Sequence, residues 1–298
     1  MLNEAILKAL RNSTHRNELF EIMEYATFPA GKLFRPRLVE AMALDLNQKF
    51  SPEHIHLAAA LELHHAYTLV HDDLPAMDND LIRRGKASTH AQFGEWKAIL
   101  AGDGLLISSF HELHKIQHQN AQKVFKLFSW ATGARGLILG QFLDLGASGK
   151  LSLDEVMRIH ELKTARLLQI ATLGSYLLST THPTAKAAKI YLRLGREIGL
   201  CFQLLDDLSD LDVKEINQHE KDINPFLINT KASFKELNSS LARLKTILRG
   251  NKLPHIEKML SDFFAKTRND LLTSERMISN HLSGVDLKDW INSSFSSL

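Results

Sequence analysis

Apolar residues recur at helical spacing along most of this chain, and this periodicity restricts the fold more than any other feature. From Ile55 onward the apolar positions follow a helical period to about Leu74. The sequence contains no alternating apolar and polar runs joined by Asn-Gly or Asp-Gly turns, which would indicate β-hairpins. It therefore predicts an all-α fold.

Capping residues and prolines indicate where the helices begin. Ser51 and Pro52 form an N-cap followed by a first-turn proline. Ser152 and Glu155 have the spacing of a capping box, which predicts a second helix start. A third helix is expected over about residues 183–206.

Composition and charge exclude several classes of protein. The 298 residues include 36 Lys and Arg against 34 Asp and Glu, a formal net charge of +2, whereas nucleic-acid-binding domains show a basic excess. Cys201 is the only cysteine, which excludes a disulfide scaffold and fits a reducing cytosol. No apolar run approaches the roughly 20 residues that cross a bilayer. Because no Gly/Ser/Pro-rich linker divides the chain, we expect a single domain over residues 1–298. We expect it to be cytoplasmic, without nucleic-acid partners or stable membrane insertion.

Two acidic clusters follow long helical segments, at residues 71–80 and 203–210. Carboxylates near the carboxyl end of a helix are unfavourable, because unpaired carbonyl groups there already carry partial negative charge. Finding this arrangement twice suggests that a bound cation offsets its cost. Mg²⁺ takes carboxylate oxygens and keeps water or phosphate in its remaining positions. The clusters are therefore candidate magnesium sites, and solvated helix ends are the alternative.

The spacing within the clusters bears on this interpretation. Asp206 and Asp210 lie four residues apart and share a helix face. In the first cluster Pro75 is expected to end or bend the helix, so that Asp78 turns back toward Asp72. The geometry therefore agrees with a cation site at the second cluster and allows one at the first.

Basic residues accompany the acidic clusters. Arg83 and Arg84 directly follow the first cluster, further basic residues lie within 31–37, and Lys163 with Thr164 stands inside a predicted helix. Arginine recognises phosphate oxygens in a bidentate manner, and lysine supplies a point charge. Carboxylates that hold Mg²⁺ beside arginines describe a diphosphate site. Surface ion pairing is the alternative for Arg83 and Arg84.

These residues form motifs that resemble those of the trans-isoprenyl diphosphate synthases, most closely the bacterial farnesyl diphosphate synthases. The resemblance extends from about Gly31 to Pro225, with the motifs in the family's order. One Asp-Asp-x-x-Asp is weak evidence, whereas two at this separation with basic elements between them are highly specific. The motifs are Gly31-Lys32-x-x-Arg35-Pro36, Asp72-Asp73-x-x-x-x-Asp78, Arg83-Arg84-Gly85-Lys86, Ala101-Gly102-Asp103, Gly140-Gln141-x-x-Asp144-Leu145, Lys163-Thr164 and Phe202-Gln203-x-x-Asp206-Asp207-x-x-Asp210.

The resemblance implies an isoprenoid-synthase fold, a helical bundle in which both aspartate motifs face a deep central cavity. It also implies a homodimer and three Mg²⁺ ions in each active site. The positions that match the family's metal ligands are Asp72, Asp78 and Asp206, assisted by Asp73, Asp207 and Asp210.

The resemblance also implies the substrate-binding residues. Arg83 matches the residue that grips the allylic diphosphate. The isopentenyl diphosphate site matches Lys32, Arg35, His65 and Arg84. The positions that line the diphosphate and the nascent cation match Lys163, Thr164 and Gln203. A later diphosphate-binding lysine matches Lys221, through its Lys-x-x-x-Pro spacing to Pro225.

The implied reaction joins an allylic diphosphate, first dimethylallyl and then geranyl, to isopentenyl diphosphate. The allylic C–O bond ionises, the double bond of isopentenyl diphosphate attacks the carbocation, and the bound pyrophosphate takes the proton. Metal ions and cationic side chains stabilise the departing pyrophosphate. The protein itself positions the substrates and excludes water.

Product length is expected to depend on the residues before the first motif. Thr68 lies one helical turn, about 5.4 Å, before Asp72, and Tyr67 lies just beyond it. In the family, an aromatic residue at the position of Tyr67 resembles the arrangement in the bacterial enzymes that make fifteen-carbon products. We therefore expect (2E,6E)-farnesyl diphosphate, with geranyl or geranylgeranyl diphosphate as alternative products. A core role is the alternative for Tyr67.

The chain departs from the family pattern at several positions. Ala30 and Leu33 replace a glycine and a basic residue usual there, which predicts weaker binding of isopentenyl diphosphate. Asn79 replaces an aspartate often found at that position. The stretch 210–221 is shorter than the usual loop after the second motif, which leaves the role of Lys221 open and predicts a reduced lid-like closure.

Two other interpretations can be weighed on the sequence. Glu53-x-x-His56 and Glu62-x-x-His65 have a spacing found in di-iron bundles, but both fall on one predicted helix, whereas such sites need facing helices. A catalytically silent partner subunit of a prenyl synthase would keep the helices and lose aspartates, whereas both aspartate motifs are intact here.

Overall fold

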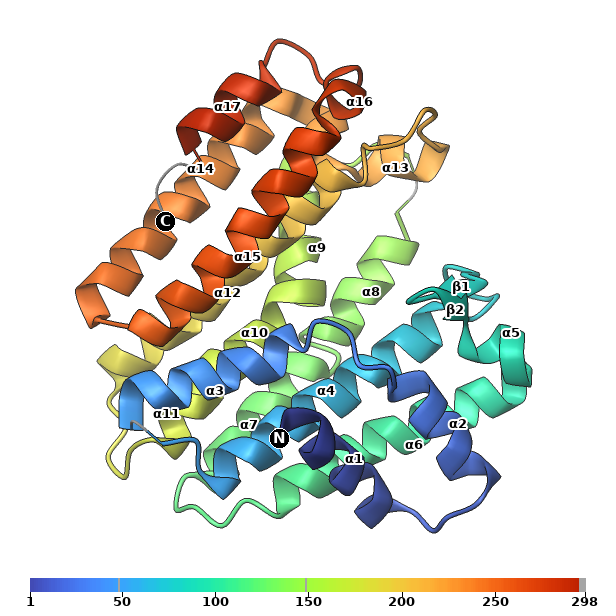
Figure 1. Cartoon of the computed structure of the whole chain (residues 1–298), viewed down its shortest axis with the longest axis vertical. Coiled ribbons are helices and arrows are strands. Elements are labelled where there is room, and N and C mark those ends of the chain that lie inside the picture. Colours follow the sequence, from blue (N-terminus) through green and yellow to red (C-terminus); the bar gives the residue numbers. More distant parts are fainter. Residues whose placement is uncertain (48, 148, 295–298) are drawn as a thin grey trace. The chain divides into compact units, whose positions relative to one another are not determined.

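The computed structural model describes residues 1–47, 49–147 and 149–294, and it confirms the all-α prediction (Figure 1). The chain forms two compact units. Unit 1 comprises residues 1–127 and 174–183, and unit 2 comprises residues 128–173 and 184–298. Within the described ranges, no helix combines the length and apolar character needed to span a membrane.

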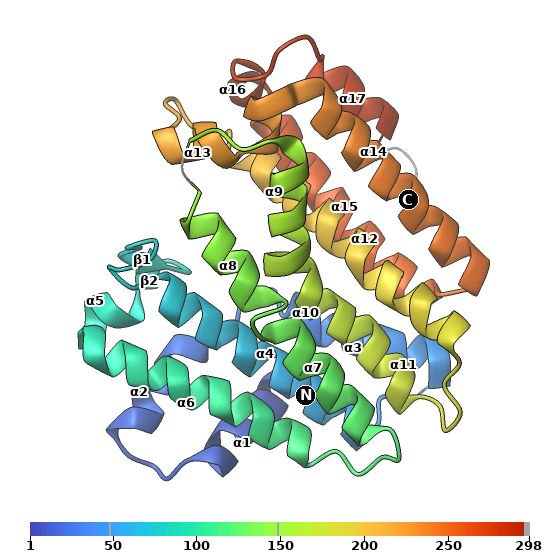
Figure 2. The same ribbon diagram turned by 180° about the vertical axis from the view of Figure 1, so that it is seen from behind.

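Unit 1 is built around α4 (Pro52–Asp72), which packs against α1 (Leu2–Ser13), α3 (Phe34–Asn47) and α6 (Glu95–His114). α4 and α6 lie side by side in both views of the ribbon (Figures 1 and 2). Since α4 has neighbours on several sides, most of its side chains are buried. The other elements are α2 (Glu18–Thr27), β1 (Ile82–Arg83), β2 (Lys86–Ala87), α5 (Thr89–Phe93), the first part of α7 (Ala121–Thr132), and α11 (Ser175–Leu178).

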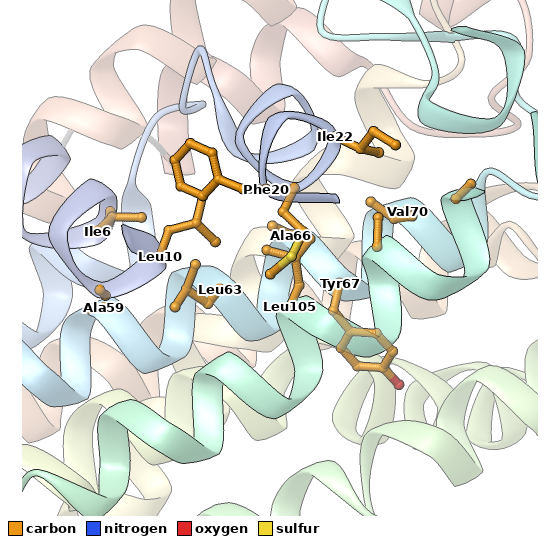
Figure 3. Packing of buried hydrophobic residues seen from close by; sticks show 14 residues of the cluster. Ile6, Leu10, Phe20, Ile22, Ala59, Leu63, Ala66, Tyr67, Val70 and Leu105 are labelled. Atoms are coloured by element: carbon orange, nitrogen blue, oxygen red, sulfur yellow. The ribbon is translucent and has the colours of Figure 1, made fainter. Parts of the chain in front are cut away.

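Side chains from α1, α2, α4 and α6 form the core of unit 1 (Figure 3). Leu10, Phe20 and Leu63 meet in this cluster. Tyr67 also belongs to it, but its ring points away from Leu10 and Phe20 (Figure 3). α4 thus places the Tyr67 ring on the opposite side of the helix from the α1 and α2 contacts.

The ends of α4 follow from local sequence. The helix begins at Pro52 after the N-cap Ser51, as predicted. It ends at Asp72, slightly before the expected end near Leu74. The residue before a proline is disfavoured in helical conformation, so Leu74, which precedes Pro75, lies outside the helix.

In the part of the chain that the structure describes, a short β-hairpin in unit 1 is the one departure from the expectation that there are no strands. β1 and β2 pair antiparallel, with Ile82 opposite Ala87. The connecting residues Arg84 and Gly85 have φ angles of 54° and 77°, both positive as a type I′ turn requires. Such turns are usually Asn-Gly or Asp-Gly, so an Arg-Gly pair gives little signal in the sequence.

Unit 2 is organised around α12 (Ala185–Ser209), which lies beside α14 (Pro225–Asn251) in both views (Figures 1 and 2). α12 also packs against a helical segment formed by α9 (Leu153–His160), the π-helix η1 (Glu161–Ala165) and α10 (Arg166–Gln169), which continues into the π-helix η2 (Ile170–Gly174). The other elements are α8 (Leu137–Leu145), α13 (Gln218–Ile223), α15 (Pro254–Thr273), α16 (Glu275–Ser279) and α17 (Leu287–Ser294).

The predicted helix starts in unit 2 are confirmed with small shifts. Ser152 and Glu155 form the expected capping box at α9, in which the Ser152 backbone N–H donates to Glu155 Oε2 at 2.8 Å. α12 begins at Ala185, because the side chain of Thr184 caps it. The helix continues past Asp206 to Ser209, so the second acidic cluster occupies its last turn.

Three glycines allow helices of unit 2 to approach one another closely. A Cβ atom at Gly140, Gly195 or Gly199 would lie 2.5 Å from a backbone atom of residues 163–169. A real Cβ atom would force the backbones apart. These glycines therefore set α8 and α12 directly against the helical segment that carries Lys163.

Replacing Gly195 by Ala should destabilise the fold, because the new methyl group would lie 2.5 Å from the α10 backbone. Overpacking of this kind costs about 1–3 kcal/mol, which would lower the midpoint of urea unfolding. Gly250→Ala is the matched control, since Gly250 is also helical and a Cβ there has nothing within 4 Å. Alanine at that position should be neutral or stabilise by up to ~1 kcal/mol. Equal midpoints for the two variants would contradict the argument.

Candidate functional site: two acidic helix ends and their basic neighbours

The first acidic cluster lies at the carboxyl end of α4 in unit 1. Asp72 is the last residue of α4, and Asp73 is its C-cap. The chain turns at Pro75, and the backbone N–H of Asp78 donates to the carbonyl oxygen of Asp72 at 2.8 Å. The predicted return of Asp78 toward Asp72 is thereby confirmed. The side chain of Asp78 is exposed and that of Asp72 is half-buried.

Arg83 pairs with two acidic residues of this cluster. Its Nη2 atom lies 2.5 Å from Asp73 Oδ1 and 2.6 Å from Asp80 Oδ2. Burial raises the pKa of the Asp73 carboxyl, and the guanidinium of Arg83 acts in the opposite direction. Arg83 therefore ties β1 to the end of α4 through the ion pairing that the sequence leaves open as an alternative.

The hairpin also holds the chain that leads into the Gly31-Lys32 motif. Arg84 Nη1 donates to the carbonyl oxygens of Thr27 and Pro29, each at 3.3 Å. Lys86 Nζ donates to two further carbonyl oxygens of segment 25–29, at 2.5 and 2.6 Å. The Arg-Arg-Gly-Lys motif thus positions the residues just before the next basic motif.

A buried carboxylate, Glu62, lies among the residues predicted to bind isopentenyl diphosphate. Glu62 Oε1 is 3.8 Å from Arg84 Nη2. Burial raises the pKa of Glu62, against the effect of the positive charges of Arg35 and Arg84. The pKa of His65 is well below its usual value, because of burial and the same two guanidinium groups. Arg35, His65 and Arg84 are therefore gathered around Glu62, while the side chain of Lys32 is exposed.

His71 anchors the end of α4 to α6. Its Nε2 atom lies 3.1 Å from the carbonyl oxygen of Ile99 and 3.8 Å from Asp103 Oδ1. A Cβ atom at Gly102 would lie 2.2 Å from the His71 ring, so the Ala-Gly-Asp motif provides the space for this ring. These contacts support an orienting role for His71.

The two predicted chain-length residues differ in their surroundings. Tyr67 is 9% exposed and packs edge-on against the rings of His64 and His71, with centroids 4.9 and 5.2 Å apart. Thr68 is also buried, and its hydroxyl donates to the carbonyl oxygen of His65 at 2.8 Å. Thr68 is thus engaged within α4, and Tyr67 is the bulkier group to limit adjacent space.

The second acidic cluster occupies the end of α12 in unit 2. Asp206 is exposed, Asp207 is buried, and Asp210 is the C-cap, whose backbone N–H donates to the Asp206 carbonyl at 2.9 Å. Burial and the charges of Asp206 and Glu220 raise the pKa of Asp210 to about 7. The predicted concentration of negative charge at this helix end is confirmed.

A chain of hydrogen bonds links η1 to this cluster. Thr164 Oγ1 donates to Gln203 Oε1 at 2.7 Å, and Gln203 Nε2 donates to Asp207 Oδ1 at 2.9 Å. The other carboxylate oxygen of Asp207 lies 3.3 Å from His160 Nε2. Burial raises the pKa of Asp207 well above its usual value and lowers that of His160 to about 4. Burial thus favours the neutral form of both groups.

Lys163 stands beside Thr164 in the π-helix η1. Its Nζ atom donates to Asp144 Oδ2 on α8 at 2.6 Å. π-Helical turns are rare and are found frequently at functional sites. The predicted helical setting of Lys163 and Thr164 is confirmed, and the structure adds Asp144 as the partner of the lysine.

The predicted late lysine, Lys221, lies exposed on α13. The neighbouring Asn224 connects α13 to the second cluster. Its Nδ2 atom donates to the carbonyl oxygen of Asp207 at 2.8 Å and lies 3.4 Å from Glu220 Oε2. The structure therefore brings the carboxylate of Glu220 toward α12.

The sequence does not indicate a role for His160 or Asn224, and it indicates one for Glu62 only through the Glu-x-x-His spacing of the di-iron alternative. Glu62 and His160 each precede a motif residue, His65 and Lys163, by three positions, which places them on the same helix face. This spacing is the feature of the sequence that points to Glu62 and His160 as neighbours of the site residues. The contacts of Asn224 with α12 and α13 come from packing that the sequence pattern does not display.

Buried polar atoms without a hydrogen-bond partner occur at several motif residues. Among the described residues they include Arg35 Nε, both amide atoms of Gln141, His160 Nδ1 and Asp207 Oδ2. Such groups cost free energy unless a ligand, ion or water meets them. The carboxylates themselves are oxygen donors of the kind that Mg²⁺ prefers. The chemistry of these residues therefore fits magnesium and diphosphate as ligands.

The described part of the chain contains no group of three His, Cys, Asp or Glu side chains that could hold an ion by itself. Mg²⁺ usually binds through one or two carboxylates together with water and substrate phosphates. The Glu-x-x-His pairs of the di-iron alternative both lie on α4. There His56 Nδ1 lies 2.8 Å from Glu112 Oε2, and Glu62 lies beside Arg84, so the structure gives that alternative no support.

Comparison with known proteins places the chain in a family. The family described as polyprenyl synthetase matches residues 16–241. Farnesyl diphosphate synthase of Micrococcus luteus is 35% identical over 241 residues, which cover 80% of each chain. Geranylgeranyl diphosphate synthase of Cyanophora paradoxa is 38% identical over 200 residues, which cover 65% of each chain.

A solved structure resembles most of the chain. The geranyltransferase of Helicobacter pylori, complexed with magnesium and isoprenyl diphosphate, superposes with a TM-score of 0.72 at 27% identity, covering 89% of this chain and 95% of that one. The family match includes residues of both units and the motifs from Gly31 to Asp210. The chain therefore belongs to the polyprenyl synthetase family and is a prenyltransferase with the isoprenoid-synthase fold.

Proposed function

We propose that this chain condenses dimethylallyl and then geranyl diphosphate with isopentenyl diphosphate, giving (2E,6E)-farnesyl diphosphate and pyrophosphate. The observation that carries the proposal is the pair of intact acidic motifs at the ends of α4 and α12, each with fixed polar neighbours. The chain would then act as one domain over residues 1–298.

Mg²⁺ is the proposed cofactor, with three ions in each active site. When bound, these ions stabilise the negative charge that develops on the departing pyrophosphate. The buried Asp207 carboxylate, whose Oδ2 atom lies 3.3 Å from His160 Nε2 without forming a hydrogen bond among the described residues, supports a ligand at the second cluster. The proposed ligands are Asp72, Asp73, Asp78, Asp206, Asp207 and Asp210.

The basic residues of unit 1 have proposed roles on two diphosphates. Arg83 would bind the allylic diphosphate by exchanging its ion pairs with Asp73 and Asp80 for phosphate oxygens. Isopentenyl diphosphate would bind to Arg35, His65 and Arg84, which lie around Glu62. The exposed Lys32 would complete this site. Glu62 would keep the guanidinium groups apart and oriented when no diphosphate is present.

Three residues of unit 2 are proposed to face the reacting carbon atoms. Lys163 is held by Asp144 at 2.6 Å, so its ammonium group is fixed in position. The hydroxyl of Thr164 donates to Gln203, which leaves its oxygen lone pairs available to a nearby positive charge. The carbocation would be stabilised by these oxygens until isopentenyl diphosphate attacks, and the pyrophosphate would accept the proton.

Tyr67 is proposed to set product length. Its ring is large and is held edge-on by His64 and His71, so it cannot move aside without losing these contacts. A growing chain that meets the ring would stop at fifteen carbons. Geranylgeranyl diphosphate is the second candidate product, because similar proteins are named geranylgeranyl diphosphate or pyrophosphate synthases.

A cytoplasmic homodimer is the proposed state of the protein. α6 exposes large apolar side chains along one stretch, namely Trp96, Ile99, Leu100 and Ile107, which are between 43% and 65% exposed. A second copy of the chain would cover such a stripe. The single cysteine fits a reducing compartment.

The activity proposal predicts product formation by the chain alone. Dimethylallyl and labelled isopentenyl diphosphate with Mg²⁺ should give a fifteen-carbon product on chromatography. Asp72→Ala and Asp206→Ala should each lower turnover by at least about 10³-fold with unchanged circular dichroism, since each removes a proposed metal ligand. Asp262→Ala, at an exposed position of α15, is the control. Near-normal turnover in the first two variants would contradict the metal roles, and an inactive wild type would favour the silent partner subunit.

Tyr67→Ala should lengthen the product beyond fifteen carbons, because removing the ring opens space beyond Thr68. Chromatography of the dephosphorylated products measures this directly. Tyr67→Phe keeps the ring and should still give farnesyl diphosphate. If folded Tyr67→Ala also stops at fifteen carbons, Tyr67 is a core residue without a role in chain length.

The raised pKa of Asp210 predicts a pH-dependent stability in the presence of EDTA. Because the folded-state pKa is about 7, above the ordinary value near 3.9, the folded state keeps this proton while the unfolded state releases it. The contribution of Asp210 is therefore fully present below about pH 4 and is lost as the pH rises toward 7. Asp210→Asn should match the wild type in thermal melting at pH 4 and exceed it at pH 8. Identical melting temperatures at pH 8 would show that Asp210 is not destabilised by its neighbours.

A further inference from the structure

The α2–α3 connection, residues 28–33, carries Gly31 and Lys32 and lies against the hairpin. Arg35 follows it in the first turn of α3. A Cβ atom added at Gly31 would lie 3.3 Å from three atoms of the Arg84 guanidinium group, so the connection packs closely on the hairpin. All these residues belong to unit 1. The position of the first basic motif therefore depends on contacts with the hairpin.

The α2–α3 connection ends in a backbone conformation that it would not favour by itself. Leu33 has a φ angle of 49°, in the left-handed region that residues with a Cβ atom rarely adopt. Such a conformation persists only where the surrounding structure holds it. The backbone between Lys32 and Arg35 is therefore maintained by the segments that contact the connection.

Lys86, on β2, supplies charged donors to the start of this connection and to the end of α2. Its Nζ atom donates to the carbonyl oxygens of Tyr25 and Phe28 at 2.5 and 2.6 Å. The same atom lies 3.5 Å from the centroid of the Tyr25 ring, and the Tyr25 hydroxyl donates to the carbonyl oxygen of Ala87 at 2.8 Å. An ammonium group has three donor hydrogens, so two carbonyls and a ring face occupy all of its directions.

The surroundings of Lys86 differ from those of a surface lysine. The residue is half-buried, and burial together with the positive charge of Arg84 lowers the pKa of its ammonium group. Within the described ranges, no carboxylate is paired with it. Burying a charge is costly unless hydrogen bonds compensate it, and here backbone carbonyls provide them. The ammonium group of Lys86 is thus committed to holding the backbone.

We propose that Lys86 is a positioning residue for isopentenyl diphosphate, which holds the α2–α3 connection so that Lys32 and Arg35 are in place before the substrate binds. This inference rests on the proposed function, in which those two residues bind this diphosphate. Lys86 itself would not touch the substrate. Without its ammonium group, the connection would relax from the conformation of Leu33, and only a fraction of the molecules would present the binding arrangement. The apparent dissociation constant rises in inverse proportion to that fraction.

Calorimetric titration of the full-length chain with isopentenyl diphosphate, without an allylic substrate, tests the inference. Lys86→Met keeps a long side chain but removes the donors. It should raise the dissociation constant about tenfold, as expected if a tenth of the molecules keep the binding arrangement. Lys86→Arg should restore most of the affinity, because a guanidinium group can also donate to two carbonyls and stack on a ring. Amide hydrogen exchange over residues 28–33 should be faster in Lys86→Met than in the wild type.

Lys97→Met is the matched control. Lys97 also ties α2 to a neighbouring element, since its Nζ atom donates to Glu18 Oε1, but it does so at the other end of that helix. This variant should leave the dissociation constant unchanged. Dimethylallyl diphosphate, titrated with Mg²⁺, should bind Lys86→Met as it binds the wild type, because Arg83 is held at the end of α4 and not by the connection. Equal weakening of both diphosphates would overturn the inference.

Lys32→Met separates failure of this inference from failure of the proposed function, and its exposed position makes the fold insensitive to the change. If Lys32→Met weakens binding of isopentenyl diphosphate and folded Lys86→Met does not, the inference is overturned and the proposed site stands. If the wild type does not bind isopentenyl diphosphate, the proposed site and the inference both fail. Thermal melting verifies that each variant is folded.

Discussion

Negative charge gathered at the carboxyl ends of α4 and α12 is the constraint on which the rest of the structure depends. Helix carbonyl groups already make these ends negative, and burial adds to the cost by raising the pKa of Asp73 and Asp207. Fixed donors hold the buried acids: Arg83 pairs with Asp73, and Gln203 donates to Asp207. The carboxylates of Asp78 and Asp206 remain exposed. The fold thus maintains acids where a cation would relieve them.

Besides its acidic cluster, unit 1 carries a group of positive charges that unit 2 does not match at the end of α12. In unit 1, Arg35 and Arg84 lie around the buried carboxylate of Glu62, so two positive charges face one negative charge there. In unit 2, Glu220 adds to the charge of the aspartates at the end of α12. A diphosphate alone suits the first arrangement, and a diphosphate with divalent ions suits the second. Two substrates that both carry a diphosphate group, but differ in whether they need metal ions, would match these two arrangements.

Local sequence rules predicted the features that depend on a few neighbouring residues. The capping box of Ser152 and Glu155 and the turn at Pro75 were found because their determinants lie within a few positions. The sequence does not predict the hairpin, because Arg84 occupies a positive-φ position that Asn or Asp usually fills. The π-helix around Lys163 leaves no mark on apolar periodicity. Contacts between segments that are separated in the sequence, such as that between Asn224 and Asp207, can be seen only in the structure.

The arrangement of polar groups in unit 2 favours a reaction in which the substrate ionises over one in which the protein attacks. The hydroxyl of Thr164 is committed to Gln203, and the single thiol, Cys201, is buried with a raised pKa, which makes it a poor nucleophile. Lys163 Nζ donates to Asp144 Oδ2. What these groups offer is fixed positive charge and oriented oxygen atoms. Such a site suits a substrate that carries its own leaving group, because the pyrophosphate released on ionisation can then serve as the base.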